Sequence, residues 1–409
     1  MGDPVQIEDY EEFIGAEAVE RIREKAEPLR GYHLANINST YYGGGVAELL
    51  SSLTLLFDCV GLKAGWRVIQ GSPDYFSVTK KMHNALQGGD INMTDRKKKI
   101  YEDTLRKNSI RNHLDHDMVI VHDPQPAAFI QNYERSSPWI WRCHLDLSEP
   151  EEKTWQYLEQ FVSRYDAAIF SIEDYRRKLD IPQLIFPPAI DPFSIKNREL
   201  SDEEIDDRLE HYDIPGDLPL VVQISRFDKY KDPEGVIEAY KKVRKEEECT
   251  LVLLGNVATD DPEGEEVYKS LLEHREDRII ILSKQDTALV NALQRRAAVV
   301  VQKSLREGFG LTVTEAMWKG KAVVGGKAGG ITRQIEDGVN GYLVSSVDET
   351  AQRILKLLRD EKLRRKMGRK ARKTVVENYL MSRLLENYLD MIRSFQIRFE
   401  LSGYPGRVY

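Results

Sequence analysis

The chain has 409 residues, of which 41% are hydrophobic and 31% charged, and its net charge is −8. This length is too great for one hydrophobic core and predicts two domains. The acidic balance gives no electrostatic footprint for nucleic acid, and no apolar stretch approaches the roughly 18 residues of a membrane helix. The composition therefore favours a globular protein that binds neither nucleic acid nor a membrane. Its abundance of Lys, Arg and Glu is typical of thermophiles.

The N-terminus and the cysteines indicate the compartment. The first residues, MGDPVQIEDYEEF, lack a basic stretch followed by an apolar one, so they do not form a secretory signal. Cys59, Cys143 and Cys249 are too widely spaced for a metal motif or a disulfide framework. We expect a reduced, cytoplasmic setting.

The first half of the chain alternates short apolar runs with amphipathic segments. Helical patterns cover residues 46–61 and 151–165. Strands that alternate with helices predict a parallel sheet covered on both faces. The expected strands are residues 32–38, 66–71, 117–123, 139–145, 167–172 and 183–188.

A second series of strands follows, so we predict an α/β fold with two Rossmann-like, doubly wound domains. Residues 187–219 combine prolines, a charge run and turn residues, as a linker does, and the chain after about residue 350 is predicted to be continuously helical. The predicted domains are residues 1–195, joined by a C-terminal helix at about 380–409, and residues 196–379. The second series of strands is 219–226, 249–256, 278–284, 298–304, 321–327 and 341–346.

The first candidate site is a glycine loop. Gly43, Gly44 and Gly45 follow the first strand and open a helix. Glycine lets the backbone approach a ligand closely, and the free N–H groups at a helix start favour anions. The spacing is not G-x-G-x-x-G, so a dinucleotide site is not supported. An ordinary tight turn is the alternative.

Polar residues at two strand ends form the second candidate. Asp123 in HDPQP and His144 in RCHLDLS each lie at the end of a predicted strand. The carboxyl ends of parallel strands meet at one edge of a sheet, so the two side chains are expected to face one cleft. The alternative for His144 is a structural role.

The third candidate is a pair of cations in ISRFDKYKDPEG. Arg226 ends a strand, and Lys231 precedes a helix that Asp232 is expected to cap. Arg and Lys at this spacing can neutralise a diphosphate from two sides. Two solvated surface charges are the alternative.

The fourth candidate is EGFGLTVTE, residues 307–315, with GGKAGGI at 325–331 behind it. Glu307 lies in a predicted strand-to-helix loop, and Glu315 lies about one turn into the helix that begins near Leu311. The free N–H groups at the helix start can bind an anion. A carboxylate such as Glu315 can bind ribose hydroxyls, as acidic residues do in other nucleotide sites. Together these features predict a site for a sugar joined to a nucleoside diphosphate.

These motifs carry a resemblance to a known family. EGFGLTVTE followed by GKAVVGGKAGGI resembles the E-x7-E signature and trailing glycine loop of retaining glycosyltransferase family 4, and SRFDKYKD resembles that family's Arg/Lys pair. The resemblance covers about residues 30–395 and implies the GT-B architecture, in which an interdomain cleft separates two Rossmann-like domains. NINSTYYGGGVAELL, VIVHDPQPA and WRCHLDLS resemble the trehalose-forming members.

The resemblance implies a reaction and its substrates. Such enzymes form trehalose from a nucleotide-diphosphate glucose, such as UDP-glucose or ADP-glucose, and free glucose, and the reaction is reversible. The alternatives are a trehalose phosphorylase, which uses glucose 1-phosphate, a family 4 enzyme with another acceptor, and a non-catalytic sugar-nucleotide sensor. The nucleotide base and the oligomeric state stay open, and a homo-oligomer is possible.

The resemblance also implies roles for the residues that contact the leaving nucleotide. Arg226 and Lys231 would neutralise the diphosphate, together with the helix start at Leu311 and Thr312, and Glu315 would hold the ribose. The base would lie near residues 283–286, and the loop at Gly43–Gly45 would close over the phosphates.

The remaining roles concern the sugars. Glu307, with the backbone at Gly308, Phe309 and Gly310, would hold donor-sugar hydroxyls. His144 would contact the donor sugar near its reacting carbon, and Asp123 would hold the acceptor glucose. No metal or other cofactor is expected, since this architecture uses cationic side chains and helix ends in place of a divalent cation. Asp260 and Asp261 are accordingly not assigned to a metal.

Overall fold

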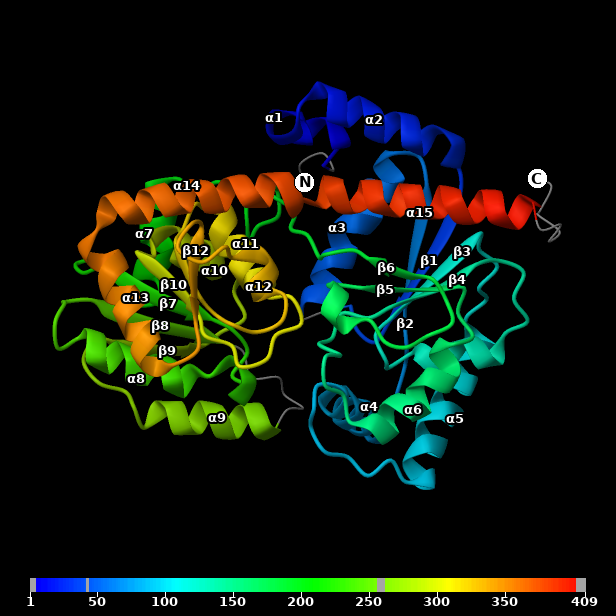
Figure 1. Ribbon diagram of the computed structural model, residues 1–409, viewed down its shortest axis with the longest axis horizontal. Coiled ribbons are helices and arrows are strands. Elements are labelled where there is room, and N and C mark those ends of the chain that lie inside the picture. Colours follow the sequence, from blue (N-terminus) through cyan, green and yellow to red (C-terminus); the bar gives the residue numbers. More distant parts are fainter. Residues whose placement is uncertain (1–4, 42–43, 256–261, 402–409) are drawn as a thin grey trace. The chain divides into compact units, whose positions relative to one another are not determined.

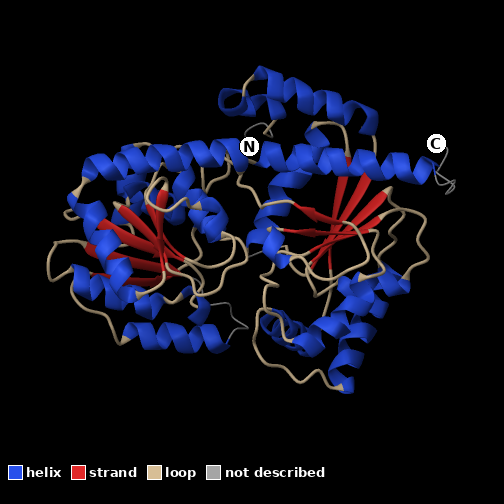
Figure 2. Ribbon diagram, viewed as in Figure 1, coloured by secondary structure: helices blue, strands red, loops and turns tan. Residues whose placement is uncertain are grey.

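The computed structural model describes residues 5–41, 44–255 and 262–401, and the chain divides into two compact units (Figure 1). The first unit is Met1–Ala189 together with Met381–Tyr409, and the second unit is Ile190–Leu380. Each unit contains one six-stranded parallel sheet (Figure 2). Twelve strands were expected from the apolar runs, and all twelve are present. The α/β class with two doubly wound sheets is therefore confirmed.

In the first unit the strand order is β2-β1-β3-β4-β5-β6. The chain leaves β1 toward β2 on one side and later returns to β3 on the other, so the topological switch point lies between β1 and β3. Open α/β sheets bind ligands beyond the carboxyl ends of the strands at such a point. The strands are β1 (His33–Asn38), β2 (Lys63–Val68), β3 (Met118–His122), β4 (Trp139–Arg142), β5 (Ala167–Phe170) and β6 (Gln183–Ile185).

Helices cover both faces of this sheet. α3 packs on β2, α15 packs on α3, and α2 packs on α15, so segments from the two ends of the chain lie side by side (Figure 1). The other face is covered by α4, α5, α6 and the short 3-10 helix η3. The helices are α1 (Glu11–Ile14), α2 (Ala16–Ala26), α3 (Gly45–Cys59), α4 (Pro73–Leu86), α5 (Asp95–Arg111), η3 (Ala127–Asn132), α6 (Glu152–Val162) and α15 (Met381–Leu401).

α15 contacts the rest of the first unit through buried aromatic rings, and ion pairs lie at the exposed edge of this contact. The ring of Tyr388 meets those of Phe57 and Phe186 edge to face, at centroid distances of 5.8 Å and 5.3 Å. At the rim, Glu386 of α15 accepts from Arg21 of α2 at 2.7 Å. Exposed ion pairs contribute about 0–1 kcal/mol each, so the buried rings supply most of the stability of this contact.

In the second unit the strand order is β12-β11-β10-β7-β8-β9, the order of a Rossmann sheet, with its switch point between β7 and β10. α8 and α13 bury their apolar sides on one face of the sheet, while α10 and α11 pack on the other (Figure 1). The strands are β7 (Leu220–Ile224), β8 (Thr250–Gly255), β9 (Ile279–Ser283), β10 (Val299–Gln302), β11 (Val323–Gly326) and β12 (Gly341–Val344). The helices are α7 (Asp202–Glu210), the 3-10 helix η5 (Lys229–Lys231), α8 (Pro233–Val243), α9 (Pro262–Leu272), α10 (Thr287–Arg296), α11 (Leu311–Trp318), α12 (Ile331–Gln334), α13 (Val347–Arg359) and α14 (Glu361–Asn378).

Two sequence predictions about connections were wrong. The chain after residue 350 is not one helix, because it breaks at Asp360, whose side chain caps α14 by accepting from the Leu363 N–H at 2.8 Å, and again at Tyr379–Leu380. Most of residues 187–219 is not a linker, because from Ile190 onward the chain belongs to the second unit and forms α7. Ser201 and Glu204 close a capping box at the start of that helix.

Within the described ranges, no helix is both long and apolar enough to span a bilayer.

Candidate functional site

In the second unit, the residues predicted to bind the sugar-nucleotide donor follow the two strands at the switch point. Arg226 and Lys231 come after β7, and Glu307 and Glu315 come after β10. β7 and β10 are neighbours in the sheet, with Val221 opposite Val299. The topology therefore brings the four residues to one edge of the sheet, where such folds bind ligands.

Lys231 and Glu307 are in direct contact. Lys231 Nζ lies 2.6 Å from Glu307 Oε2, and the two side chains are only 15% and 10% exposed. Ser304 Oγ donates to the same carboxylate oxygen at 3.1 Å. The backbone fastens the two loops together, since the Leu305 N–H donates to the Tyr230 carbonyl at 2.7 Å. The first carboxylate of the E-x7-E pair is thus held in place by a cation from the neighbouring strand.

A second ion pair between these loops was not anticipated. Lys303, which follows β10, pairs with Asp232 at the start of α8. The expected cap is confirmed, because Asp232 Oδ1 accepts from the Gly235 N–H at 3.1 Å. Asp232 also has a left-handed backbone, with φ of +50°, which Asp tolerates better than most residues. Only the strand-end position of Lys303 hinted at this pair.

Arg226 lies apart from these pairs. Its side chain is 51% exposed, and its ion pair is with Asp228 at 3.4 Å. Among the described residues it contacts neither Lys231 nor Glu307. The guanidinium therefore stays available to a ligand at the same edge of the sheet.

The helix start at 308–312 has the expected form. Gly310 is the N-cap of α11 with φ of +87°, a conformation that glycine adopts without strain. The N-cap glycine has no side chain to cap the helix, so the N–H groups of its first turn, at Leu311 and Thr312, are open to an anion. Gly308 and Phe309 lead into this turn.

Contacts from α12 fix the same loop. Gln334 Nε2 donates to the Phe309 carbonyl at 2.6 Å, while Gln334 Oε1 accepts from Thr314 Oγ1 at 2.6 Å. A Cβ on Gly330 would lie 2.5 Å from Phe309 Cα, so only glycine permits this approach. The glycines of GGKAGGI thus let α12 pack against the loop that carries Glu307.

Glu315 lies one turn into α11 and is 3% exposed. Its Oε1 lies 3.3 Å from Lys196 Nζ, and its Oε2 accepts from Gln294 Nε2 at 3.4 Å. Neither partner was predicted from the sequence, because Lys196 lies in a segment that resembled a linker and Gln294 lies within α10. The two carboxylates of the E-x7-E pair thus have different cationic partners.

The segment expected near the nucleotide base, residues 283–286, connects β9 to α10. Asp286 caps α10 by accepting from the N–H groups of Ala288 and Leu289, and it also accepts from the Tyr212 hydroxyl at 2.8 Å. Its carboxylate is therefore occupied by structural contacts. Asp260 and Asp261 lie outside the described residues.

In the first unit, Asp123 and His144 are brought together as the sequence predicted. Asp123 Oδ1 accepts from the His144 backbone N–H at 2.8 Å. Asp123 has φ of +68°, and its carbonyl accepts from the Trp141 indole N–H at 3.0 Å. Asp123 Oδ2 and His144 Nδ1 make no hydrogen bond within the described chain. Neither belongs to the fully buried polar atoms that lack a partner, so both atoms reach the surface. Both are therefore available to ligand hydroxyls.

Burial and one neighbouring cation set the charges at this site. Burial raises the pKa of Asp123 to about 7, although the His144 N–H and the nearby Arg142 act in the opposite direction. Burial, with a smaller contribution from Arg142, lowers the pKa of His122 to about 3. The same causes hold the pKa of His144 well below its usual range. Both imidazoles are therefore neutral at neutral pH.

Three residues around this site were not singled out from the sequence. His122 lies between His144 and Asn36, at 3.1 Å from each. Arg142 is fully buried, and one of its nitrogens donates to the Phe186 carbonyl at 2.9 Å. For His122 and Arg142, a position at a strand end was the only signal. Asn36, His122 and Arg142 lie within strands that read simply as apolar runs.

The glycine loop is only partly described. Gly43 lies outside the described residues. Gly44, with φ of +85°, is the N-cap of α3, which begins at Gly45 and has no side-chain cap. The open N–H groups at this helix start fit the expected anion contact.

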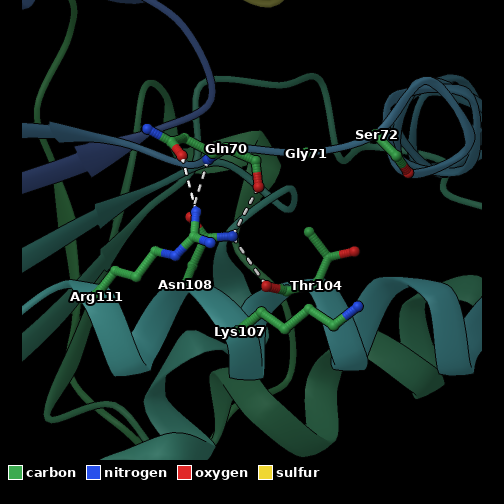
Figure 3. A pocket seen from close by; sticks show the side chains of 7 residues that line it. All are labelled: Gln70, Gly71, Ser72, Thr104, Lys107, Asn108 and Arg111. Atoms are coloured by element: carbon green, nitrogen blue, oxygen red, sulfur yellow. Dashed lines mark hydrogen bonds between the residues drawn. The ribbon is translucent and has the colours of Figure 1, made fainter.

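No metal centre is present in the described parts of either unit, where no three His, Cys, Asp or Glu side chains come close enough to hold an ion. A hollow of about 260 Å³ lies elsewhere in the first unit, beside the start of α4 and along α5 (Figure 3). Asn108 joins its two sides by bonding both backbone groups of Gln70. None of the predicted site residues lines this hollow.

Family models match both halves of the chain. The model "Trehalose synthase, N-terminal domain" matches residues 36–177, and "Glycosyl transferases group 1" matches residues 204–374. A trehalose synthase of Thermococcus litoralis is 44% identical over 405 residues, covering 96% of this chain and 98% of the relative. One of Rubrobacter xylanophilus is 40% identical and covers 93% and 95% of the two chains. A trehalose phosphorylase of Pleurotus pulmonarius is 26% identical, and 58% of that protein is covered.

Solved structures share the fold. A UDP-forming α,α-trehalose-phosphate synthase from Burkholderia xenovorans superposes with a TM-score of 0.72 at 13% identity, covering 89% of this chain and all of the other. A sucrose-phosphate synthase from Thermosynechococcus elongatus gives a TM-score of 0.70 at 18% identity, with 90% and 100% covered. These likenesses confirm the GT-B fold class.

Proposed function

This chain belongs to the trehalose synthase family of glycosyltransferases, and on that basis we propose that it transfers glucose, with retention, from a nucleotide-diphosphate glucose to free glucose to form trehalose. The observation that carries the proposal is the convergence of Arg226, Lys231, Glu307 and the open start of α11 beyond β7 and β10. The archaeal relatives fit the thermophile composition.

The leaving group is the nucleoside diphosphate. When the bond from the anomeric carbon to the phosphate oxygen breaks, positive charge develops on the sugar and negative charge on the phosphate. Arg226, Lys231 and the N–H groups at Leu311 and Thr312 would stabilise that negative charge most strongly in the transition state. These groups can do so without a divalent cation.

Glu307 would bind hydroxyls of the donor sugar instead of attacking it. A carboxylate that is paired with Lys231 at 2.6 Å and accepts from Ser304 is a weakened nucleophile. We therefore favour attack by the acceptor hydroxyl on the same face that the phosphate leaves, with the phosphate oxygen taking the acceptor's proton. The new bond then forms to the anomeric carbon without a covalent glycosyl-enzyme.

The buried Glu315 would serve the nucleotide. It is held by Lys196 and Gln294, and its carboxylate would accept from two ribose hydroxyls. In the first unit, Asp123 Oδ2 and His144 Nδ1 are the available atoms for sugar hydroxyls. We assign Asp123 to the acceptor glucose and His144 to the donor sugar, with the Gly44–Gly45 loop on the phosphates.

Phosphorolysis of trehalose is the second candidate, because fungal trehalose phosphorylases match 90% of this chain. One product analysis separates the two. The protein is offered UDP-glucose, ADP-glucose or glucose 1-phosphate with free glucose, and trehalose with phosphate. We expect trehalose only from the nucleotide donors. Trehalose from glucose 1-phosphate alone would favour the phosphorylase, and no transfer from any donor would favour a sensor.

A further inference from the structure

Three polar side chains of the first unit, His144, His122 and Asn36, are joined by hydrogen bonds. His144 Nε2 lies 3.1 Å from His122 Nδ1, and His122 Nε2 lies 3.1 Å from Asn36 Oδ1. The two rings are nearly parallel, with an interplanar angle of 15° and centroids 5.4 Å apart. His122 and Asn36 are each 1% exposed. Neither His122 nor Asn36 has a part in the chemistry described so far.

Asn36 sets the direction of these hydrogen bonds. With the Asn36 amide oriented so that Oδ1 faces His122, the oxygen can only accept, and the proton between them sits on His122 Nε2. A neutral imidazole carries one ring proton, so His122 Nδ1 is then an acceptor. His144 Nε2 must therefore be the donor, which leaves His144 Nδ1 as a bare lone pair.

The neighbouring strand keeps both rings neutral. Arg142 lies opposite His122 in the register of β3 and β4, so the two side chains share one face of the sheet. Arg142 is fully buried and has no ion pair among the described residues, while its guanidinium lies over the Tyr388 ring at 5.8 Å. A second buried positive charge beside it, on either imidazole, would be strongly disfavoured.

We propose that His122 is a positioning residue that fixes the plane and the tautomer of His144, so that His144 presents Nδ1 as a hydrogen-bond acceptor to a hydroxyl of the bound sugar. This inference rests on the proposed function in one respect, that the ligand facing His144 is a sugar. The hydrogen bonds that join the ring to His122 and His122 to Asn36 do not depend on the identity of that ligand.

Two substitutions of His122 separate its two bonds. The side-chain amide of Asn reaches the position of Nδ1, so His122→Asn keeps the contact with His144. The amide of Gln reaches the position of Nε2, so His122→Gln keeps the contact with Asn36 and loses the one with His144. His122→Phe loses both while conserving bulk.

The expected kinetic result follows from that split. His122→Gln and His122→Phe should lower kcat by about 10–100-fold, by analogy with the loss of a residue that orients a metal-binding histidine. His122→Asn should retain most of the wild-type kcat. KM should change little in all three, as for an interaction that matters in the transition state. A role confined to packing would instead make His122→Phe the mildest variant, and that ranking would overturn the proposal.

A spectroscopic readout tests the orientation without turnover. In the ligand-free full chain labelled with ¹⁵N-histidine, long-range ¹H–¹⁵N correlation shows which ring nitrogen of His144 carries the proton, with His144→Gln assigning the signal. We expect a single Nε2-protonated tautomer in the wild type and a mixture of tautomers in His122→Gln. A mixture or an Nδ1-protonated ring in the wild type would overturn the inference. A wild type that makes no trehalose would contradict only the proposed function.

Discussion

At the scale of single residues, the site owes its organisation to pairing between side chains from neighbouring strands. Lys231 pairs with Glu307, and Lys196 pairs with Glu315, so each carboxylate has a cation beside it in a largely buried position. Arg226, by contrast, is half-exposed and engaged only with Asp228. This difference decides which substitutions report on function and which also disturb the fold.

Arg226→Ala should lower turnover by about 10²-fold or more, by analogy with the loss of other groups that stabilise a developing negative charge. The free energy of unfolding should change by about 0.5 kcal/mol or less, because the side chain is half-exposed. Lys229→Ala, an exposed cation three residues along the same loop, is the matched control and should leave kcat unchanged. Near-normal turnover in Arg226→Ala would remove Arg226 from the site.

Lys231→Ala should lower turnover as strongly but should also destabilise the second unit. It leaves the Glu307 carboxylate buried without its cation, which costs about 3–5 kcal/mol in comparable buried pairs. The double variant Lys231→Ala/Glu307→Gln should recover much of that stability but none of the activity. Thermal denaturation and initial rates of the single and double variants measure both effects.

The two carboxylates of the E-x7-E pair should divide the substrate between them. Glu315→Gln should weaken the binding of a free nucleoside diphosphate by about 1.5–3 kcal/mol, the value of a hydrogen bond to a charged group. Glu307→Gln should leave that affinity nearly unchanged and mainly depress kcat. Calorimetric titration of both variants with the nucleoside diphosphate is the measurement. Equal losses of affinity would show that the assignment of roles is wrong.

Asp123 should make stability depend on pH. Its pKa is raised to about 7 in the folded state, from an ordinary value of 3.8. The cost of ionising it is therefore absent below about pH 4, grows as pH rises and is complete above pH 7. Asp123→Asn accepts from His144 equally well, and Asn also tolerates a positive φ. The variant should be more stable than the wild type at pH 8, by at most about 4 kcal/mol, with the gain vanishing at pH 4.

The opposite sign would contradict the burial of this carboxyl. A variant that is less stable than the wild type at pH 8 would mean that the charged form of Asp123 is favoured in the fold. The depressed pKa values of His122 and His144 act in the other direction, since they cost stability as pH falls below about 6.5. Comparing the wild type with Asp123→Asn at the same pH removes the contribution of the two histidines, which both proteins share.

At the scale of elements, loops at the carboxyl ends of strands are held by close backbone packing. Gly330 lets α12 approach Phe309, and Gln334 then fixes the loop from both sides. The start of α11 is thereby aimed before any ligand arrives. Such preorganisation is what allows backbone N–H groups to stabilise charge in a transition state.

Gly330→Ala should depress activity through this packing. The added methyl group would lie 2.5 Å from Phe309 Cα, so the loop must shift. We expect about 10-fold or more loss of kcat, since small misplacements of a site cost rate steeply. Gly216→Ala in the same unit is the control, because its Cβ meets nothing within 4 Å. A fully active Gly330→Ala would show that the loop position tolerates the shift.

Sequence patterns predicted the strands and the loops that carry the site, but not the bonds between loops. Each buried strand is a short apolar run bounded by turn residues, and the strand ends locate Asp123, His144, Arg226 and Lys231. The pairs Lys231–Glu307 and Lys196–Glu315 join residues 76 and 119 positions apart, so local pattern cannot reveal them. The break at Asp360 was missed because polar helices continue on both sides of it. The cap is recognised only from the hydrogen bond that the Asp360 side chain accepts from the Leu363 N–H.

At the scale of the whole molecule, the candidate site residues of both units lie at or beyond the carboxyl ends of the strands at their switch points. In the first unit these are β1 and β3 with the adjacent β4, and in the second β7 and β10. The same physical rule thus operates twice in one chain. Under the proposed function, the edge in the first unit contacts sugars and phosphates, and the edge in the second unit contacts the nucleotide and the donor sugar.

The whole enzyme should keep its activity in excess chelator. The motivation is the role given to Arg226, Lys231 and the start of α11, which supply the charge that a divalent cation provides elsewhere. The measurement is the initial rate of trehalose formation with and without chelator, with magnesium added back as the control. Activity that disappears with chelator and returns with magnesium would show that the diphosphate is held by a metal.

The discontinuity of the first unit has a consequence for biosynthesis. Residues 190–380 are contiguous, so the second unit can close as soon as they leave the ribosome, whereas the first unit lacks α15 until the final segment emerges. Until then Phe57 and Phe186 have no Tyr388 to cover them. Because domains generally fold as units during synthesis, the second unit can fold while the first unit still lacks α15. A ribosome stalled after residues up to 380 have emerged from its exit tunnel would therefore hold a folded second unit and an incomplete, chaperone-accessible first unit.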